Sequence, residues 1–309
     1  MAPLHTLPAM QTGRHASSYG IFAHMVAPDR AHRGLPFDER CSAMNETRPD
    51  PLPDLIGLIP AAGQATRIAP LPCSKELYPV GLRSTADGVR PKVVCEDLLE
   101  KMARAGIRTV YVVLRTGKWD IPAYLGDGSA LDIHVAYLMM RLPFGPPYSL
   151  DQAYPFVRHS LVALGFPDIL LEPDDVFVRL RTRQAETGAD LVLGLFPTDR
   201  PETCDMVATD PAGRAQQLVM KPMSTTLQHA WLIAVWTPRF TQFLHDHMAA
   251  AITLAAASPV PRREMHVGEV IQAAIEAGLH VNTLQFPQGW YLDIGTPEGL
   301  ARLYRARES

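Results

Sequence analysis

The sequence has little cysteine, no long hydrophobic run and no excess of basic residues, and each absence excludes a class of protein. Its four cysteines form no C-x-x-C pair, which argues against a structural zinc site and against a disulfide framework. No apolar stretch approaches the roughly 20 residues needed to cross a bilayer, and the N-terminus lacks the charged-then-apolar order of a secretory signal. We therefore expect a cytoplasmic protein with no membrane partner.

Charge is nearly balanced along the 309 residues. The chain carries 29 Lys and Arg against 32 Asp and Glu, a net charge of −3, so no overall basic field attracts it to nucleic acid. A hydrophobic content of 47% is sufficient for a sizeable core. Any anion that the protein binds must therefore be held by local groups.

Two regions differ in character. Residues 1–50 show neither helical nor strand periodicity and mix His, Pro, Arg and Ser with Gly, which predicts a disordered N-terminal extension. From residue 51 onward short apolar runs alternate with helical patterns. Strands are expected at 55–59, 107–114, 133–139, 161–166 and 191–196, and helices at 91–105, 149–158 (with Ser149 as its N-cap) and 174–186. This alternation predicts a mostly parallel sheet flanked by helices, because parallel neighbours require crossovers.

The second half of the chain departs from that alternation. Two short strands at 205–209 and 215–220, around an Asp-Pro-Ala-Gly turn, predict an inserted β-hairpin. Further strands are expected at 231–236 and 281–286, and helices at 238–256, at 267–278 and from Pro297. We find no internal repeat, and expect one α/β domain over residues 51–309 with a Rossmann-like sheet.

The loop after the first expected strand has the composition of a phosphate-binding turn. In open α/β sheets ligands bind at the carboxyl ends of the strands, and residues 61, 62, 63 and 65 are all Ala or Gly. Small residues let the backbone approach a ligand and offer it N–H groups. Arg67 and Lys75 add two positive charges suited to a triphosphate. By itself the loop is equally consistent with a Gly/Ala turn beside two surface cations.

Seven segments resemble, in order, the motifs of one enzyme family. They are 58–67 (LIPAAGQATR), 74–80 (SKELYPV), 125–129 (LGDGS), 149–153 (SLDQA), 166–168 (FPD), 220–222 (MKP) and 290–298 (WYLDIGTPE). Together they resemble the signature of the sugar-1-phosphate nucleotidylyltransferases, the glucose-1-phosphate thymidylyl- and uridylyltransferases. The resemblance implies the nucleotide-diphospho-sugar transferase fold, with a nucleotide half at about 51–196 and an acceptor half at about 197–309. It implies that a nucleoside triphosphate, with dTTP or UTP favoured, is joined to a sugar 1-phosphate.

The resemblance also implies roles for single residues. Arg67 and Lys75 match the residues that grip the triphosphate, and Asp168 and Asp293 match the pair that holds Mg²⁺ between carboxylates. Hard carboxylate oxygens suit that ion, and Asp168 is thereby a catalytic residue as well as a metal ligand. Gln152 matches a glutamine that reads the edge of the base. The remaining nucleotide-binding residues are Ala61, Ala62, Gly63, Gln64, Ala65 and Thr66.

The acceptor side departs from the family pattern. Lys221 matches the lysine that contacts the phosphate of the sugar 1-phosphate, but Met220 replaces the preceding glutamate, and Asp205 stands where a glycine usually lies against the sugar. These three residues form the expected sugar-phosphate site. On the nucleotide side Ala65 replaces a glycine, so its Cβ should crowd a ligand or demand an ordinary backbone conformation. The acceptor is therefore not assigned to glucose 1-phosphate.

Two other functions remain open at this stage. The altered acceptor residues are also consistent with a non-catalytic nucleotide-sugar sensor. A glycosyltransferase with a related nucleotide-binding domain would use Asp174 or Asp175 on its metal, although both open an expected helix and are better placed to cap it. A homodimer through residues 238–278 is possible, and we expect no added C-terminal oligomerisation domain.

Overall fold

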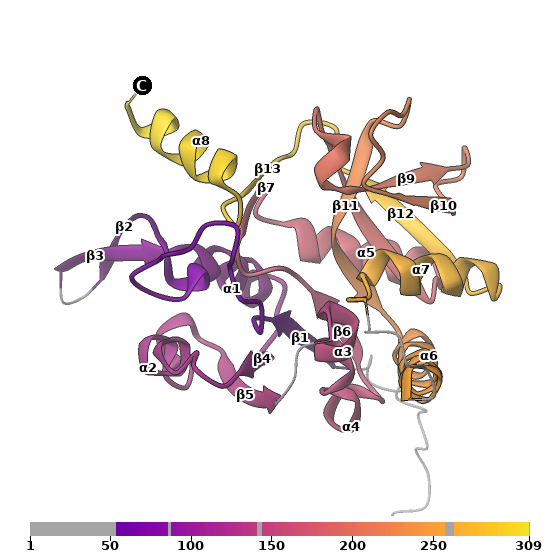
Figure 1. Cartoon of the computed structure of the whole chain (residues 1–309), viewed down its shortest axis with the longest axis horizontal. Helices are drawn as coiled ribbons and strands as arrows, with labels where there is room; N and C mark the ends of the chain where they lie inside the picture. The colour runs from indigo at the N-terminus through magenta and orange to yellow at the C-terminus, as the bar shows by residue number, and fades with distance from the viewer. Residues whose placement is uncertain (1–53, 86–87, 141–143, 257–262, 309) are drawn as a thin grey trace, which may run out of the picture. The chain divides into compact units, whose positions relative to one another are not determined.

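The computed structural model describes residues 54–85, 88–140, 144–256 and 263–308. The extension expected to be disordered, residues 1–50, lies outside them. A mixed sheet of nine strands runs through the described part of the chain, in the order β10-β9-β11-β6-β1-β4-β5, with β8 paired to β11 and β12 paired to β8 (Figure 1). Its strands are β1 Leu55–Pro60, β4 Thr109–Arg115, β5 His134–Met140, β6 Leu161–Leu164, β8 Leu191–Pro197, β9 Asp205–Thr209, β10 Ala215–Met220, β11 His229–Trp236 and β12 Val281–Gln285.

Parallel pairing dominates the first half of this sheet. β6, β1, β4 and β5 are parallel to one another, and β8 is parallel to β12. β11 is antiparallel to β6, β8 and β9, so it joins the two parallel groups. The expected hairpin is confirmed, because β9 and β10 pair antiparallel with Asp205 opposite Met220.

The apolar runs are continuous because the main strands are buried on both faces. In β1, Leu55 and Ile59 belong to the hydrophobic core on one side of the sheet, and Leu58 to the core on the other. Val192 and Leu193 divide in the same way on β8. Such strands lack the apolar and polar alternation of a strand with one wet face.

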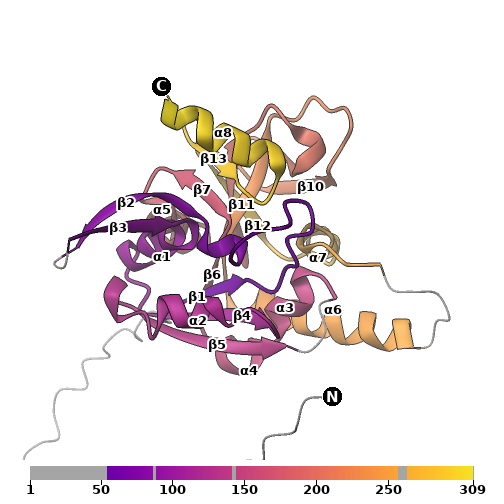
Figure 2. The same ribbon diagram turned by 60° about the vertical axis from the view of Figure 1, so that its left-hand side comes forward.

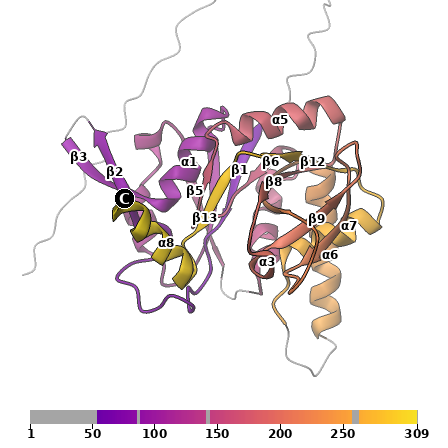
Figure 3. The ribbon, with the colours of Figure 1, turned by 90° about the horizontal axis from the view of Figure 1, so that it is seen from above.

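Helices cover both faces of the sheet. α1 and α5 pack into one core and α3, α4, α6 and α7 into the other (Figure 3). The helices are α1 Val94–Arg104, α2 Asp120–Leu125, α3 Pro146–Asp151, α4 Tyr154–Val157, α5 Val176–Thr187, α6 Pro238–Ala256, α7 Val267–Glu276 and α8 Pro297–Glu308. The expected α/β class, with a Rossmann-like sheet between helical layers, is confirmed.

Two small antiparallel pairs lie outside the main sheet, and the sequence patterns did not predict them. β2 Pro79–Thr85 pairs with β3 Gly88–Val93, and β7 Ile169–Glu172 pairs with β13 Trp290–Asp293 (Figure 2). The second pair joins segments more than 100 residues apart, and α8 follows it directly. It positions the site described below.

Two helix starts differ from the sequence expectation. The first helix begins at Val94 rather than Pro91, because Pro91 is part of β3. Ser149 is not an N-cap. α3 begins at Pro146 after Gly145, because a proline has the dihedral angle of a first helical residue and needs no N–H partner there. Ser149 is buried inside α3 and donates its hydroxyl to the Met140 sulfur at 3.2 Å.

Candidate active site

A cavity of about 650 Å³ opens where β1 and β6 end. Its wall combines the loop after β1, the turn after β6, the end of β10, the residues before α7 and the end of β13. Most of the residues singled out from the sequence line it, namely Ala62, Gly63, Gln64, Ala65, Thr66, Arg67, Lys75, Asp168, Asp205, Lys221 and Asp293. Segments distant in sequence thus meet in one cavity.

Three of the expected site residues lie outside the wall of this cavity. Ala61 is buried, and its N–H donates to the Val113 carbonyl at 2.8 Å, extending the pairing of β1 with β4. Gln152 follows the short helix α3, and its amide donates to the Tyr148 carbonyl at 3.3 Å. Met220 is 39% exposed. None of these three residues is part of the lining of the cavity.

The two expected metal ligands come from adjacent strand ends. Asp293 ends β13 opposite Ile169 of β7, and the Ile294 N–H donates to the Asp168 carbonyl at 3.0 Å. A methyl group placed on Gly295 would lie 2.6 Å from Oδ2 of Asp168 and 3.0 Å from Oδ1 of Asp293. The two carboxylates therefore converge on one point, which only a residue without a side chain leaves open.

Lys75 joins these carboxylates from η1, a 3₁₀ turn spanning Lys75–Leu77. Its Nζ lies 2.5 Å from Oδ2 of Asp168, and both side chains are largely buried. Burial acts to lower the pKa of Lys75, but the charge and hydrogen bond of Asp168, with smaller contributions from Glu76 and Asp293, raise it overall. Lys75 therefore remains a cation.

The carboxylate pair has the character of a magnesium site. Burial, and next the charge of Asp168, raise the pKa of Asp293, so the pair gains from a further cation. Within the described ranges no group of three or more His, Cys, Asp or Glu side chains could hold a metal. Mg²⁺ needs no such group, because it is commonly bound by one or two carboxylates plus substrate phosphates. The donor set fits that ion.

The other acidic pair lies elsewhere. Asp174 bonds to Lys101 and Arg104 of α1, each at 3.0 Å. Asp175 occupies the N-cap position of α5, but its side chain makes no capping hydrogen bond. The expected capping by these side chains is therefore wrong, because the α1 cations attract Asp174 away from the helix end. Neither residue lines the cavity.

Two residues of the cavity wall have a left-handed backbone. Ala65 has φ +56° and Lys221 has φ +44°, a region that costs a residue with a Cβ about 1–2 kcal/mol. Ala65 therefore has not adopted the ordinary conformation expected of a replaced glycine. Such strain gathers at functional sites because the surrounding structure must hold it in place.

The residues expected to bind the sugar phosphate lie on and beside strand β9. Burial raises the pKa of Asp205, and the charges of Lys221 and His266 oppose that rise. Oδ1 of Asp205 and Nε1 of Trp231 are buried, and neither makes a well-formed hydrogen bond within the described residues, although a weak hydrogen bond from the Trp231 ring N–H acts to lower the pKa of Asp205. Both residues line the cavity. These two polar groups are therefore only loosely paired.

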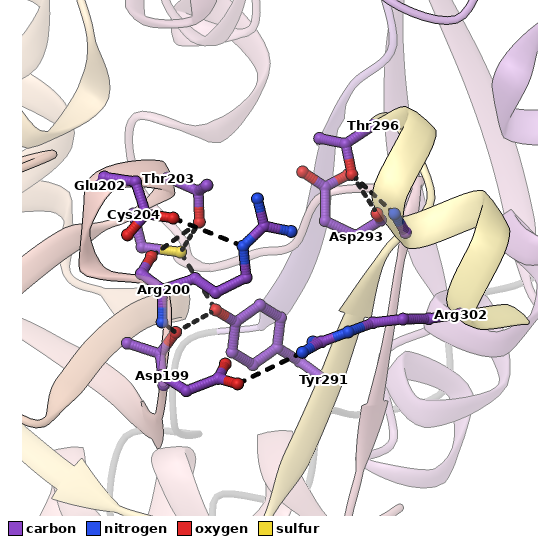
Figure 4. A network of polar contacts seen from close by, with 11 residues as sticks. Asp199, Arg200, Glu202, Thr203, Cys204, Tyr291, Asp293, Thr296 and Arg302 are labelled. Atoms are coloured by element: carbon purple, nitrogen blue, oxygen red, sulfur yellow. Dashed lines mark hydrogen bonds and ion pairs between the residues drawn. The ribbon is translucent and has the colours of Figure 1, made fainter.

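A network of polar contacts connects residues 198–204, the segment before β9, with β13 and α8 (Figure 4). The Tyr291 hydroxyl, on β13, lies 2.8 Å from the Thr198 hydroxyl and 3.1 Å from the Cys204 sulfur. On α8, Arg302 reaches Asp199 at 3.3 Å. The sequence patterns assigned no role to Tyr291 or Cys204. The only feature of the sequence that could have indicated such a role is that Tyr291 stands two residues before Asp293. Nothing in the sequence indicated Cys204.

Comparison with known proteins gives a consistent result. The family model described as "Nucleotidyl transferase" matches residues 56–308. The chain is 25% identical over 247 residues to the low-salt glycan biosynthesis nucleotidyltransferase Agl11 of Haloferax volcanii, covering 79% of this chain and 63% of that one. It is 26% identical over 257 residues to a glucose-1-phosphate thymidylyltransferase of Streptomyces griseus, covering 80% and 64%. The chain thus spans less than two thirds of the length of either relative.

A solved structure shares the fold. A UTP-bound UGPase from Acinetobacter baumannii superposes with a TM-score of 0.61 at 17% identity, covering 82% of this chain and 93% of that one. At this identity the likeness concerns the fold alone. Among the helices of the described residues, none combines the length and apolar character that a membrane crossing requires.

Proposed function

Because the chain belongs to the nucleotidyl transferase family, we propose that it joins a nucleoside triphosphate to a sugar 1-phosphate and releases pyrophosphate. The observation that carries this proposal is the convergence of Lys75, Asp168 and Asp293 in one cavity with the loop after β1. The relatives named thymidylyltransferase and the UTP-bound structure support dTTP or UTP as the nucleotide.

The chemistry needs charge neutralisation more than proton transfer. An oxygen of the acceptor phosphate, already an anion at pH 7, attacks the α-phosphorus, and the bond from the α-phosphorus to the bridging oxygen breaks as pyrophosphate leaves. Arg67 and Lys75 face the negative charge that builds on the α-phosphate oxygens. Lys221, with Asp205 and Trp231 beside it, holds the acceptor. No general base is required, so orientation in the cavity accounts for much of the rate.

Asp168 and Asp293 are the residues that would hold Mg²⁺. When bound, the ion would add positive charge to the phosphate oxygens and help to orient them. Lys75 already contacts Asp168, so the lysine and the ion would share that carboxylate. We also propose a single domain over residues 51–309 with the two halves expected above, a cytoplasmic location, and a homodimer through α6 and α7.

A pyrophosphate-release screen tests this function. Four triphosphates are crossed with a panel of sugar 1-phosphates and other phosphate or phosphonate acceptors, with and without Mg²⁺. We expect release that needs all three components, and a loss of roughly 100-fold or more in Asp168→Asn and Asp293→Asn. Asp174→Asn is the matched control, since this carboxylate lies outside the cavity, and it should retain the wild-type rate.

Other outcomes would replace the proposal. Full activity in both Asp168→Asn and Asp293→Asn would refute the assignment of the site. Tight binding of a nucleotide sugar by calorimetry, with no turnover across the screen, would indicate a sensor. Consumption of nucleotide sugars without pyrophosphate, lost in Asp174→Asn or Asp175→Asn, would indicate a glycosyltransferase.

A further inference from the structure

The two residues that flank Lys75 both form hydrogen bonds with residues 118–120. On one side, Ser74 donates its N–H and its hydroxyl to the two carboxylate oxygens of Asp120, at 2.6 and 2.8 Å. On the other side, Glu76 accepts both of its short hydrogen bonds from Nζ of Lys118, at 2.6 and 2.7 Å. The residues before and after Lys75 are thus each fixed to positions 118–120, where the loop after β4 enters α2.

The Glu76–Lys118 pair is deeply buried. Glu76 is 1% exposed and Lys118 is 4% exposed. Burying an ion pair carries a large desolvation cost, and apolar residues of similar size are often as stable. Burial raises the pKa of Glu76 and lowers that of Lys118, while the charge of each partner opposes the shift of the other. Stability alone gives little reason for such a pair beside the cavity.

Glu76 acts on two ammonium groups. Glu76 belongs to the wall of the cavity, although its side chain is almost fully buried, and its charge contributes to the raised pKa of Lys75 while its carboxylate bonds directly to Lys118. After Lys118, Lys75 is the cation whose charge acts most strongly on this carboxylate, so it is the cation that would neutralise Glu76 in the absence of Lys118. The amino group of Lys75 would then be drawn away from Asp168 and from a triphosphate.

We propose that Lys118 and Asp120 are positioning residues for Lys75. Asp120 fixes the residue before it, and Lys118 keeps the Glu76 carboxylate engaged so that Lys75 remains available to the triphosphate. This inference rests on the proposed function of the same cavity, and it adds a residue pair to which no motif assigned a role.

Replacing Lys118 and replacing Glu76 should have different effects on kcat/KM for the triphosphate. Lys118→Met leaves Glu76 free to capture Lys75, and we expect kcat/KM for the triphosphate to fall by roughly 100-fold. Glu76→Gln breaks the same pair but leaves no competing anion, so the loss should stay within about 5-fold. The double variant Glu76→Gln/Lys118→Met should regain activity to within about 5-fold of wild type.

The experiment measures the KM of the triphosphate, kcat and thermal melting for these variants of the full chain. Lys101→Met is the matched control, because Lys101 is equally buried and bonds to Asp97 and Asp174 outside the cavity. It should lower the melting temperature without changing the KM. If Lys118→Met does not fold, Lys118→Gln replaces it, with the same expected loss. Asp120→Ala, which frees Ser74, should raise the KM by about 10-fold.

The outcomes separate this inference from the function on which it rests. A wild-type protein that neither binds nor turns over any triphosphate refutes the proposed function. If the wild-type protein turns over and Lys118→Met and Glu76→Gln lose kcat/KM equally, the ion pair has only a structural role and the proposal is wrong. A double variant as impaired as Lys118→Met would show that Lys118 acts on the triphosphate directly, and would overturn the competition between Glu76 and Asp168.

Discussion

The side of the cavity proposed for the nucleotide and the side proposed for the acceptor are built differently. On the nucleotide side, Lys75 bonds to Asp168, and its neighbours bond to Asp120 and Lys118. On the acceptor side, the buried polar atoms of Asp205 and Trp231 are only loosely paired within the described residues. A preorganised wall serves a reaction that depends on orientation. Loosely paired polar groups can instead bond to a ligand without breaking strong contacts. Changes on the first side should therefore reduce kcat/KM for the triphosphate, and changes on the second should raise the KM of the acceptor.

The largest effect is expected from Gly295→Ala. The added methyl group would meet Asp168, Asp293 and Lys75 at 2.6, 3.0 and 3.3 Å, so at least one of these side chains must move. Displacements of this size at a reacting centre cost roughly 100-fold in rate. We expect kcat to fall by that factor and the Mg²⁺ requirement to rise, measured by pyrophosphate release over a magnesium titration.

Gly81→Ala is the control for that change. Gly81 lies on β2, and no atom would come within 4 Å of its added methyl group. Its rate should equal that of wild type. Wild-type kcat and magnesium dependence in Gly295→Ala would show that the convergence of the two carboxylates is not needed for turnover.

A second effect, on the KM of the acceptor rather than on kcat, should identify the acceptor side. Lys221→Met removes the cation assigned to the acceptor phosphate, and a hydrogen bond to a charged group is worth about 1.5–3 kcal/mol. The acceptor KM should rise by about 10- to 150-fold, with kcat and the triphosphate KM little changed. Gln217→Ala, at an exposed position of β10, the strand that ends just before Lys221, is the control. A fall in kcat with an unchanged acceptor KM would remove the distinction between the two sides.

Tyr291→Phe should have a weaker effect, because it keeps the ring and loses only the hydroxyl. The contacts of this hydroxyl with Thr198 and Cys204 connect β13 to the segment before β9. One such hydrogen bond contributes about 1 kcal/mol to stability. We expect a stability loss of about 1 kcal/mol in chemical denaturation and an acceptor KM raised by about 5-fold.

Cys204→Ala tests the same link from the other end. Since both changes remove one shared contact, the loss in Tyr291→Phe/Cys204→Ala should be less than the sum of the two single losses. Strict additivity of the stability losses would show that Tyr291 and Cys204 do not act together.

Much of the main sheet was predictable because its strands are continuous apolar runs. The runs at 55–59 and 191–196 correspond to β1 and β8, where burial on both faces leaves no polar positions. β7 and β13 were missed because each has only four residues and they pair across more than 100 residues. Local periodicity carries no information about such a pairing.

The cavity was predictable where backbone and motif coincide. The loop after β1 and Asp168 meet because strand ends in a parallel sheet share one edge. Lys75 and Asp293 reach the same cavity from η1 and from β13, outside the main sheet, and there the motifs alone indicated them. Gln152 and Met220 could not be placed from motif position alone, since the direction of each side chain depends on where α3 and β10 end. The contact of Glu76 with Lys118 joins positions 42 residues apart, and no spacing rule predicts it.

The smallest effect is expected from Ala65→Gly, which restores the residue usual in the family. Ala65 has φ +56°, and glycine would relieve about 1–2 kcal/mol of left-handed strain. It would also cost about 0.5–1 kcal/mol through the greater conformational entropy of the unfolded chain, so the net stability should stay equal or rise by no more than about 1.5 kcal/mol. Ala123→Gly, at an exposed position inside α2, has no strain to relieve and should lose about 1 kcal/mol. Equal losses of stability in the two variants, measured by denaturant titration, would mean that the backbone of Ala65 is not strained. The rigidity of the nucleotide side would then depend only on the hydrogen bonds and ion pairs of its side chains.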